Sequence, residues 1–395
     1  MKIHRFTVLG IILGVTLSII ATRTFAITSN NVTWSISPYP NDHNFAFTII
    51  NDVDGGYSKR LAPLFDTFDN LGLRITTTAF CFTINPDHEK HDQDNLNEHG
   101  RQSPEFFGPE NVPLTVDSER LFYKQLSKRG HEIGMHSPSR GSDTRQQLKQ
   151  GFEYFRGIFG SYPKIYVEHD CRNNKEAQSN EGADPSSAFY CTDLLNQYGS
   201  WIWIDGACAL TDQRHEKFYD ILAADGSPFN EFARKTYGIV KGFIRSGKWE
   251  NSTGEGFLQW YSKANIDDLE KNRGLALVYT HLDRRWLDRE TRRMREPIRQ
   301  RLEYLVSKDG WFVPASVILD RFQAMKNIFI SYNEKHLKVI NANSITVEGF
   351  TLISHKNQIL VYNSSVFRPN KEKEIIIGTL KPFETKAFNI IANPR

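Results

Sequence analysis

The sequence predicts an α/β protein in which a parallel sheet closes into a barrel, followed by a small all-β domain. From residue 45 to about residue 325, short apolar strands alternate with segments whose apolar residues recur at helical spacing. Beyond that point only short strand patterns remain, separated by Asn, Ser, Pro and Gly. A chain of 395 residues is long enough for two such domains, which we place at residues 27–325 and 326–395.

The elements of the first domain follow one another in the order that βαβ units require. Strands are expected over residues 45–50, 74–82, 131–135, 164–168, 201–204 and 275–279. Helical patterns are expected over residues 61–73, 118–129, 143–159, 188–198, 266–272 and 289–307. The polar stretch 85–113 predicts a long loop inserted at the rim of the barrel. In the second domain, strands are expected over residues 337–340, 345–353, 358–362, 374–380 and 385–391.

The N-terminal segment predicts that the protein is exported. Residues 1–26 hold three basic residues and no acidic one, with an apolar run over 6–21 and Ala26 at the expected cleavage point. This is the pattern of a signal peptide. It predicts a periplasmic or extracellular location and no membrane-spanning segment after its removal. An uncleaved membrane anchor is the alternative.

The charge of the chain argues against a nucleic-acid-binding protein. Lys and Arg number 49 and Asp and Glu 46, which gives a formal charge of +3. The three basic residues of segment 1–26 account for all of this excess. Without that segment the body is neutral and lacks the clustered positive charge that nucleic-acid binding needs.

Four cysteines follow the predicted cleavage point: Cys81, Cys171, Cys191 and Cys208. An even number in an exported chain is compatible with two disulfides, in one of three connectivities. Cys171 with Cys191 would close a local loop and leave Cys81 for Cys208. Isolated buried thiols are the alternative interpretation.

Acidic and imidazole side chains follow the predicted strands at points where barrel proteins carry function. Asp52 and Asp54 come directly after the strand 45–50 and precede a Gly-Gly turn. Two carboxylates in one loop can divide their roles, one binding a metal and the other accepting a proton. His136 follows the strand 131–135, which aims its ring at the same rim. Taken alone, the two aspartates would indicate an ordinary Asx turn.

At this point the sequence resembles the NodB-homology polysaccharide deacetylases, the group of carbohydrate esterase family 4. Their first motif, an apolar strand ending in paired Asp and Gly, is matched by Phe47–Gly55, and their second, Gly-His-Glu-Ile-Gly-x-His, by Gly130–His136. A later strand ending in His is matched by Leu275–His281. The resemblance covers residues 40–325. It implies a distorted (β/α) barrel with a divalent metal, usually zinc, held by one Asp and two His.

The resemblance also implies a role for each residue that matches a motif. Asp54 corresponds to the ligand carboxylate and His136 to the first ligand imidazole. Asp52 corresponds to the general base that deprotonates the attacking water, and His281 to the general acid that protonates the departing amine or alkoxide. The function implied is an exported, metal-dependent hydrolase that removes N- or O-linked acetyl groups from a polysaccharide or oligosaccharide.

The sequence departs from the family at the second imidazole ligand. That ligand is expected four residues after His136, where this chain has Arg140. A guanidinium has no lone pair to offer a metal. Our candidate replacement is His169, for which contact with substrate or simple packing is the alternative. Arg140, Arg172 and Asn173 are then expected to contact the substrate or the base carboxylate.

Two further residues are predicted to serve the substrate. Asp205, at the end of the strand 201–204, loosely matches the family's fourth motif, in which such a carboxylate tunes the catalytic base or acid, and a buried strand with a capping Asp is the alternative. Trp286 is expected to stack on a sugar ring, with Trp203 and Trp311 as further candidates. For Trp203 and Trp311, packing in the barrel is the alternative.

Two other functions stay open at this stage. A carbohydrate-binding protein of the same fold that has lost its metal would explain Arg140. A glycoside hydrolase on a similar barrel would use Asp52 or Asp54 together with Asp205 as its carboxyl pair.

Overall fold

The computed structural model describes residues 33–54, 56–82, 112–139, 141–169, 174–178, 180–203, 241–243, 252–288 and 290–393. Several predictions fall outside these ranges: the signal segment 1–26, most of the insertion 85–113, and Arg140, Cys171, Arg172, Asn173, Asp205 and Cys208. Within them, no helix has the length and apolar character needed to cross a membrane.

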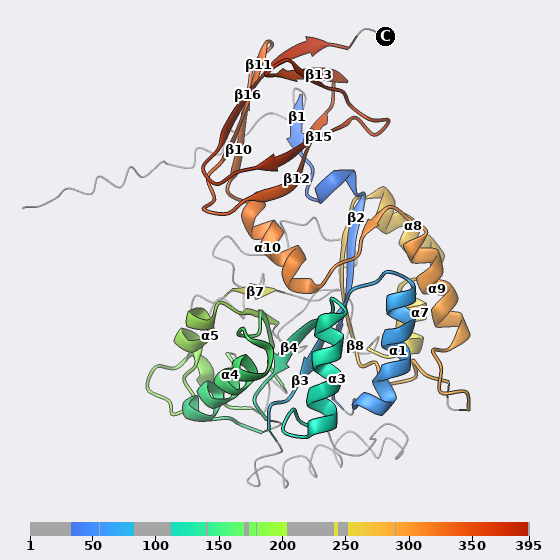
Figure 1. The fold of residues 1–395 in the computed structure, drawn as a ribbon, viewed down its shortest axis with the longest axis vertical. Coiled ribbons are helices and arrows are strands. Elements are labelled where there is room, and N and C mark those ends of the chain that lie inside the picture. Colours follow the sequence, from blue (N-terminus) through green and yellow to red (C-terminus); the bar gives the residue numbers. More distant parts are fainter. Residues whose placement is uncertain are drawn as a thin grey trace, which may run out of the picture.

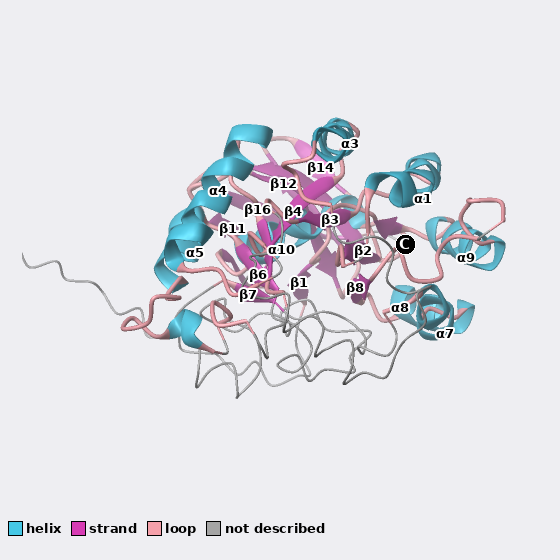
Figure 2. Cartoon of the chain, turned by 90° about the horizontal axis from the view of Figure 1, so that it is seen from below, coloured by secondary structure: helices cyan, strands magenta, loops and turns pink. Residues whose placement is uncertain are grey.

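The predicted fold class is confirmed: a curled parallel sheet carries helices on its outer side, and all-β sheets follow. Figure 2 shows these helices in an arc around the strands. The sheet order is β7-β6-β5-β4-β3-β2-β8, and β9 pairs with the start of β2. The strands are β2 (Phe45–Asn51), β3 (Thr76–Ala79), β4 (Glu132–His136), β5 (Ile165–Val167), β6 (Trp201–Trp203), β7 (Gly242–Phe243), β8 (Leu275–Thr280) and β9 (Gly310–Trp311).

Every residue of β2 and β8 is buried, which explains why both read as continuous apolar runs rather than alternating patterns. β2 pairs with β8 along one edge and with β3 on the other, both in parallel register. The carboxyl ends of all these strands therefore lie at one end of the barrel.

The helices form where capping residues and apolar spacing coincide. In α4, Thr144 and Gln147 make a capping box, and Gly160 ends the helix with a φ of 81°. The helices are α1 (Ser58–Asn70), α3 (Asp117–Lys128), α4 (Arg145–Phe159), α5 (Thr192–Tyr198), α7 (Gly254–Trp260), α8 (Lys263–Lys271), α9 (Glu296–Val306) and α10 (Ala315–Met325). Short 3-10 turns occupy Pro40–Asp42 and Glu181–Ala183.

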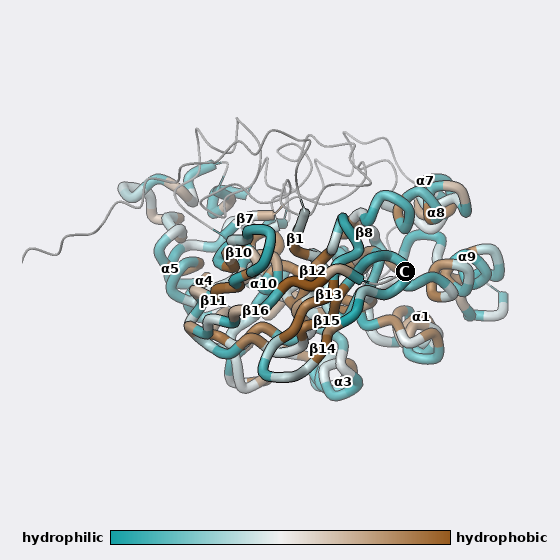
Figure 3. Tube along the Cα trace, turned by 90° about the horizontal axis from the view of Figure 1, so that it is seen from above, coloured by the Kyte–Doolittle hydropathy of each residue, from teal (hydrophilic) through white to brown (hydrophobic). Residues whose placement is uncertain are grey.

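The all-β part consists of two antiparallel sheets, β1-β12-β15 and β10-β11-β16-β13-β14. Figure 3 shows strongly hydrophobic stretches along its strands β12, β13 and β15. Strand β1 comes from the N-terminal side of the barrel, a pairing that the sequence did not predict. The strands are β1 (Trp34–Ile36), β10 (Ile328–Tyr332), β11 (His336–Asn341), β12 (Val347–Ser354), β13 (Gln358–Tyr362), β14 (Ser365–Phe367), β15 (Glu374–Leu380) and β16 (Thr385–Ala392).

Helix α10 lies between the barrel and the all-β sheets (Figure 1). Its first backbone N–H groups donate to side chains at the amino ends of barrel strands: Ala315 N to Thr76 Oγ1 at 2.9 Å and Ser316 N to Glu132 Oε2 at 3.1 Å. The helix therefore covers the amino end of the barrel. The carboxyl ends of the strands, where function is expected, lie at the opposite end.

The disulfide prediction is not borne out for the two cysteines that the structure describes. Cys81 and Cys191 are both free and buried. Each thiol lies against a carbonyl in the core, at 3.4 Å from Gly151 O for Cys81 and 3.1 Å from Glu176 O for Cys191. The alternative of isolated buried thiols therefore holds for these two residues.

Candidate metal and catalytic site

The carboxyl ends of four barrel strands bring together the residues that the motifs predict. Asp52 follows β2, His136 ends β4, His281 follows β8, and His169 lies two residues beyond β5. Asp54, in the loop after β2, completes the group. The side chains of His136 and Asp52 are 1% and 4% exposed, whereas that of Asp54 is 21% exposed, so the site meets solvent on the side of Asp54.

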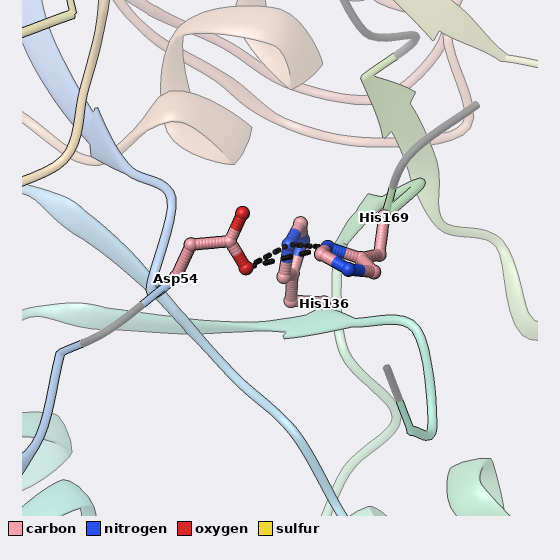
Figure 4. Close-up of side chains that lie close together, drawn as sticks. All are labelled: Asp54, His136 and His169. Carbon is pink, nitrogen blue, oxygen red and sulfur yellow. Dashed lines mark hydrogen bonds and ion pairs between the residues drawn. The ribbon is translucent and has the colours of Figure 1, made fainter. Parts of the chain in front are cut away.

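Three donor atoms face one another at the centre of the site (Figure 4). His136 Nε2 lies 3.0 Å from His169 Nδ1 and 3.4 Å from Asp54 Oδ1. The third side of the triangle, from His169 Nδ1 to Asp54 Oδ1, measures 3.3 Å. Among the described residues these three side chains form a group that could hold a metal ion.

The spacing and chemistry of this triangle fit a divalent cation. Ligand atoms about 2.0–2.2 Å from one ion lie about 3.0–3.5 Å from each other at ordinary coordination angles. One carboxylate oxygen and two imidazole nitrogens form a donor set that suits zinc. Asp54 Oδ1 is buried and accepts no hydrogen bond from the residues that the structure describes. The residues present therefore fit the metal that the resemblance implies.

The loop that carries the two aspartates is held by hydrogen bonds to neighbouring strands. Asn51 connects three segments: its Nδ2 donates to Thr77 Oγ1 at 2.8 Å, and its Oδ1 accepts from Leu282 N at 2.9 Å. Val53 N donates to Thr78 Oγ1 at 3.3 Å. These buried contacts fix the backbone on both sides of Asp52 and so orient its carboxylate.

The two imidazoles are held partly by backbone contacts and partly by an aromatic ring. Ser137 Oγ accepts from the backbone N–H of His169 at 3.3 Å, and Asn174 Nδ2 donates to its carbonyl oxygen at 2.9 Å. The ring of Phe80 meets both imidazoles, with centroids 4.7 Å from His136 and 5.4 Å from His169. Phe80 thus forms an apolar wall behind the predicted ligands.

The charges at the site compensate one another. Burial lowers the pKa of His136, but Asp52 and then Asp54 raise it to about 10. Burial opposes ionisation of both aspartates, yet His136 lowers the pKa of Asp52, and His169 and His136 hold that of Asp54 well below its ordinary value. Two buried carboxylates are therefore ionised at neutral pH and require a positive charge between them.

His281 lies on the other side of Asp52. Its Nδ1 is 3.1 Å from the backbone oxygen of Asp52 and 3.8 Å from Oδ1 of the same residue. Burial, with Arg284 adding to it, lowers the pKa of His281 to about 4. Together with Asp52 and Asp54, His281 forms a second group of potential ligands that shares Asp54 with the first.

The prediction for Trp286 is wrong. Its side chain is completely buried, its Nε1 donates to Thr280 Oγ1 at 2.9 Å, and its ring packs against Phe68 and Phe257. It is a core residue that braces the end of β8 and presents no face to a sugar. An aromatic residue that follows a strand can either stack on a sugar or pack in the core, and Trp286 packs in the core.

The other two tryptophans are not sugar platforms either. Trp203 is fully buried and its ring lies 4.8 Å from that of Tyr279. Trp311 lies in β9 beside the first residues of β2, at the amino end of the barrel, with the guanidinium of Arg321 over its ring. Both take the packing role that was their alternative.

Asp283 and Arg60 belong to the site although the sequence assigned no role to either. Both carboxylate oxygens of Asp283 are buried and have no hydrogen bond to a described residue, and Arg60 Nη1 lies 3.9 Å from its Oδ2. Burial raises the pKa of Asp283 to about 7, and Asp54 contributes to the same effect. The one available signal was the position of Asp283, two residues after His281.

No family model and no curated protein matches the chain. Among similar solved structures is a polysaccharide deacetylase from Mycobacterium smegmatis, with 14% identity and a TM-score of 0.43 over 73% of this chain and 93% of that one. A polysaccharide deacetylase from Pseudomonas aeruginosa PAO1 has 11% identity and a TM-score of 0.41 over 74% and 95%. AmyP in complex with maltose has 10% identity and a TM-score of 0.33 over 87% and 96%. We base the function on the geometry of the site.

Proposed function

We propose that this protein is a metal-dependent hydrolase that removes acetyl groups from a glycan, and that it is an exported, divergent relative of the polysaccharide deacetylases. The observation that supports this most directly is the triangle of Asp54 Oδ1, His136 Nε2 and His169 Nδ1, with sides of 3.0, 3.3 and 3.4 Å. Zinc is the proposed ion, held by these three residues. Export is proposed on the pattern of residues 1–26 alone.

The residues around the triangle have the properties that acetyl hydrolysis requires. When bound, a zinc ion would polarise the acyl carbonyl and acidify a water molecule. Asp52 is ionised at neutral pH because its pKa is lowered, so it can accept the proton of the attacking water. Nδ1 of His281 lies 3.8 Å from Asp52 Oδ1, and in its imidazolium form the ring would donate one proton to the departing nitrogen or oxygen and become neutral.

The proposal is tested by measuring the release of acetate from N-acetylglucosamine oligomers and from acetylated xylan. We expect release by zinc-loaded protein and none after chelation. Asp52→Asn should lower kcat by about 100- to 10,000-fold, because a general base contributes that much. Asp193→Asn is the matched control, since Asp193 is 48% exposed and pairs with Arg145 away from the site.

Two outcomes would contradict the proposal. Binding of the oligomers without any release of acetate would identify the chain as a carbohydrate-binding protein. New reducing ends in place of acetate would identify a glycoside hydrolase.

A further inference from the structure

We propose that Tyr279 is a positioning residue for His281: its hydroxyl holds Nε2 of the ring, so that Nδ1 faces the backbone oxygen of Asp52, the contact that fixes the Nδ1–H tautomer. This inference deepens the proposed function and rests on it, because it treats His281 as the proton donor of that reaction. It concerns a residue to which neither the motifs nor the resemblance assign a role.

The backbone of β8 places the two side chains together. Tyr279 and His281 are two residues apart at the end of a strand, so they project from the same face of the sheet. The hydroxyl of Tyr279 lies 2.7 Å from Nε2 of His281, and the two rings meet edge to face with centroids 5.2 Å apart. Both residues are buried, with relative exposures of 3% and 0%.

The opposite nitrogen decides the direction of the hydrogen bonds. Nδ1 of His281 lies 3.1 Å from the backbone carbonyl oxygen of Asp52. A carbonyl oxygen can only accept a hydrogen bond, so Nδ1 must carry the proton of the neutral ring. Nε2 is then an acceptor, and the Tyr279 hydroxyl donates to it. The two contacts together select the Nδ1–H tautomer.

The tyrosine hydroxyl can serve the ring in both protonation states. It donates to Nε2 of the neutral imidazole, and by rotating its O–H bond it accepts from Nε2–H of the imidazolium. A proton donor alternates between these two states during turnover. Without the hydroxyl, Nε2 would be a buried polar atom that had lost this partner in either state.

Tyr279 is itself held rigidly enough to act as a support. Its backbone pairs with Ile50 of β2, and the ring of Trp203 packs against its side chain with centroids 4.8 Å apart. The hydroxyl is therefore fixed relative to β2, the strand that leads to Asp52. This arrangement keeps Nδ1 of His281 directed towards Asp52, 3.8 Å from its Oδ1.

The first test compares Tyr279→Phe with Tyr39→Phe. Tyr39 is a matched control, because it is also fully buried and its hydroxyl also makes a hydrogen bond, to the carbonyl oxygen of Gly274 at the amino end of the barrel. In acetate release by the zinc-loaded protein, we expect Tyr279→Phe to lower kcat by about 10- to 100-fold with KM changed less than about twofold. Tyr39→Phe should leave both constants unchanged. Equal kcat values for the two variants would overturn the proposal.

The second test does not depend on activity or on a variant. Histidine-selective ¹⁵N labelling of the purified protein and assignment of the His281 ring reports which nitrogen is protonated at pH 7. We expect a protonated Nδ1 and an acceptor-type Nε2, and in Tyr279→Phe a shift of the Nε2 resonance away from its wild-type position. A protonated Nε2 in the wild-type protein would overturn the inference. If this pattern is found but no acetate is released, the arrangement of Tyr279 and His281 stands and the proposed function fails.

Discussion

The side chain of Asp283 lies buried beside the site, and neither of its carboxylate oxygens is hydrogen-bonded to a described residue. Native proteins pair nearly all buried polar groups, because an unpaired one costs about 1–3 kcal/mol. Arg60 Nη1 lies 3.9 Å from its Oδ2 and is also buried with no hydrogen bond to a described residue. We interpret this buried carboxylate, which has a long ion-pair contact and no hydrogen bond to a described residue, as a cost to stability that the molecule tolerates at a functional site.

We therefore expect Asp283→Asn to be more stable than the wild type at pH 8, by about 1–3 kcal/mol in the free energy of unfolding. Burial raises the pKa of Asp283 to about 7, so the folded state binds the proton more tightly than the unfolded state does. The contribution of Asp283 to the free energy of unfolding of the wild type therefore falls as pH rises from about 4 to about 7. Urea unfolding at pH 5 and pH 8 should show that Asp283→Asn exceeds the wild type in the free energy of unfolding by more at pH 8 than at pH 5. A variant less stable than the wild type at both values would contradict this interpretation.

At the scale of residues, sequence motifs predict proximity better than they predict roles. The approach of Asp54, His136 and His169 could be predicted, because the carboxyl ends of parallel strands meet at one edge. Their role as ligands stays a prediction. The burial of Trp286 could not be predicted, since an aromatic residue after a strand fits a sugar platform and a core equally well. Asp283 follows His281 by two residues, but nothing in the sequence shows that its carboxylate is buried with no hydrogen bond to a described residue.

At the scale of elements, α10 is the helix that closes the amino end of the barrel. It buries residues around most of its circumference: Ala315, Ser316, Ile318, Leu319, Phe322, Ala324 and Met325. A helix buried on several sides lacks the single apolar stripe that reveals amphipathic helices in a sequence. This explains why the sequence analysis predicted α3 and α4 but not α10.

Leu319→Ala should destabilise the protein by about 2–5 kcal/mol, because Leu319 is completely buried and its loss leaves a cavity. Val317→Ala in the same helix is the control: Val317 is 42% exposed, so we expect a change below about 0.5 kcal/mol. Denaturant unfolding measures both. Zinc affinity should be unchanged in the two variants, since α10 contacts the end of the barrel opposite the site. A loss of zinc affinity in Leu319→Ala without a loss of stability would contradict the assignment of a structural role to α10.

At the scale of the whole molecule, the barrel and the all-β sheets share one apolar core. A single cluster of buried residues extends from β2 and β8 through α10 into β11, β12 and β15. A buried ion pair also crosses this junction, between Arg273 Nη2 and Glu374 Oε1, and Ser37 Oγ bonds to both residues. The change from helices to strands near residue 325 could be predicted from sequence. The pairing of β1 with β12 could not, because a three-residue strand has too short a pattern.

We expect the barrel and the all-β sheets to unfold together in one thermal transition, because one cluster of buried apolar residues spans the junction between them. Differential scanning calorimetry measures this. Glu374→Gln should lower the midpoint of that single transition, since it removes the charge that Arg273 faces at the junction. Two separate transitions in the wild-type protein would show that the two parts are independent.

The most direct test of the central claim is the zinc content of the protein after equilibrium dialysis. We predict one tightly bound ion per chain, an affinity lower by at least about 100-fold in His136→Ala and in His169→Ala, and no change in His336→Ala, whose histidine is exposed on β11. Asp52 and Asp54 raise the pKa of His136 to about 10 against the effect of burial, so zinc must displace a proton, and the affinity should rise about tenfold per pH unit between pH 6 and 8. No bound zinc in the wild type, or equal zinc affinity in the wild type and His169→Ala, would contradict the account.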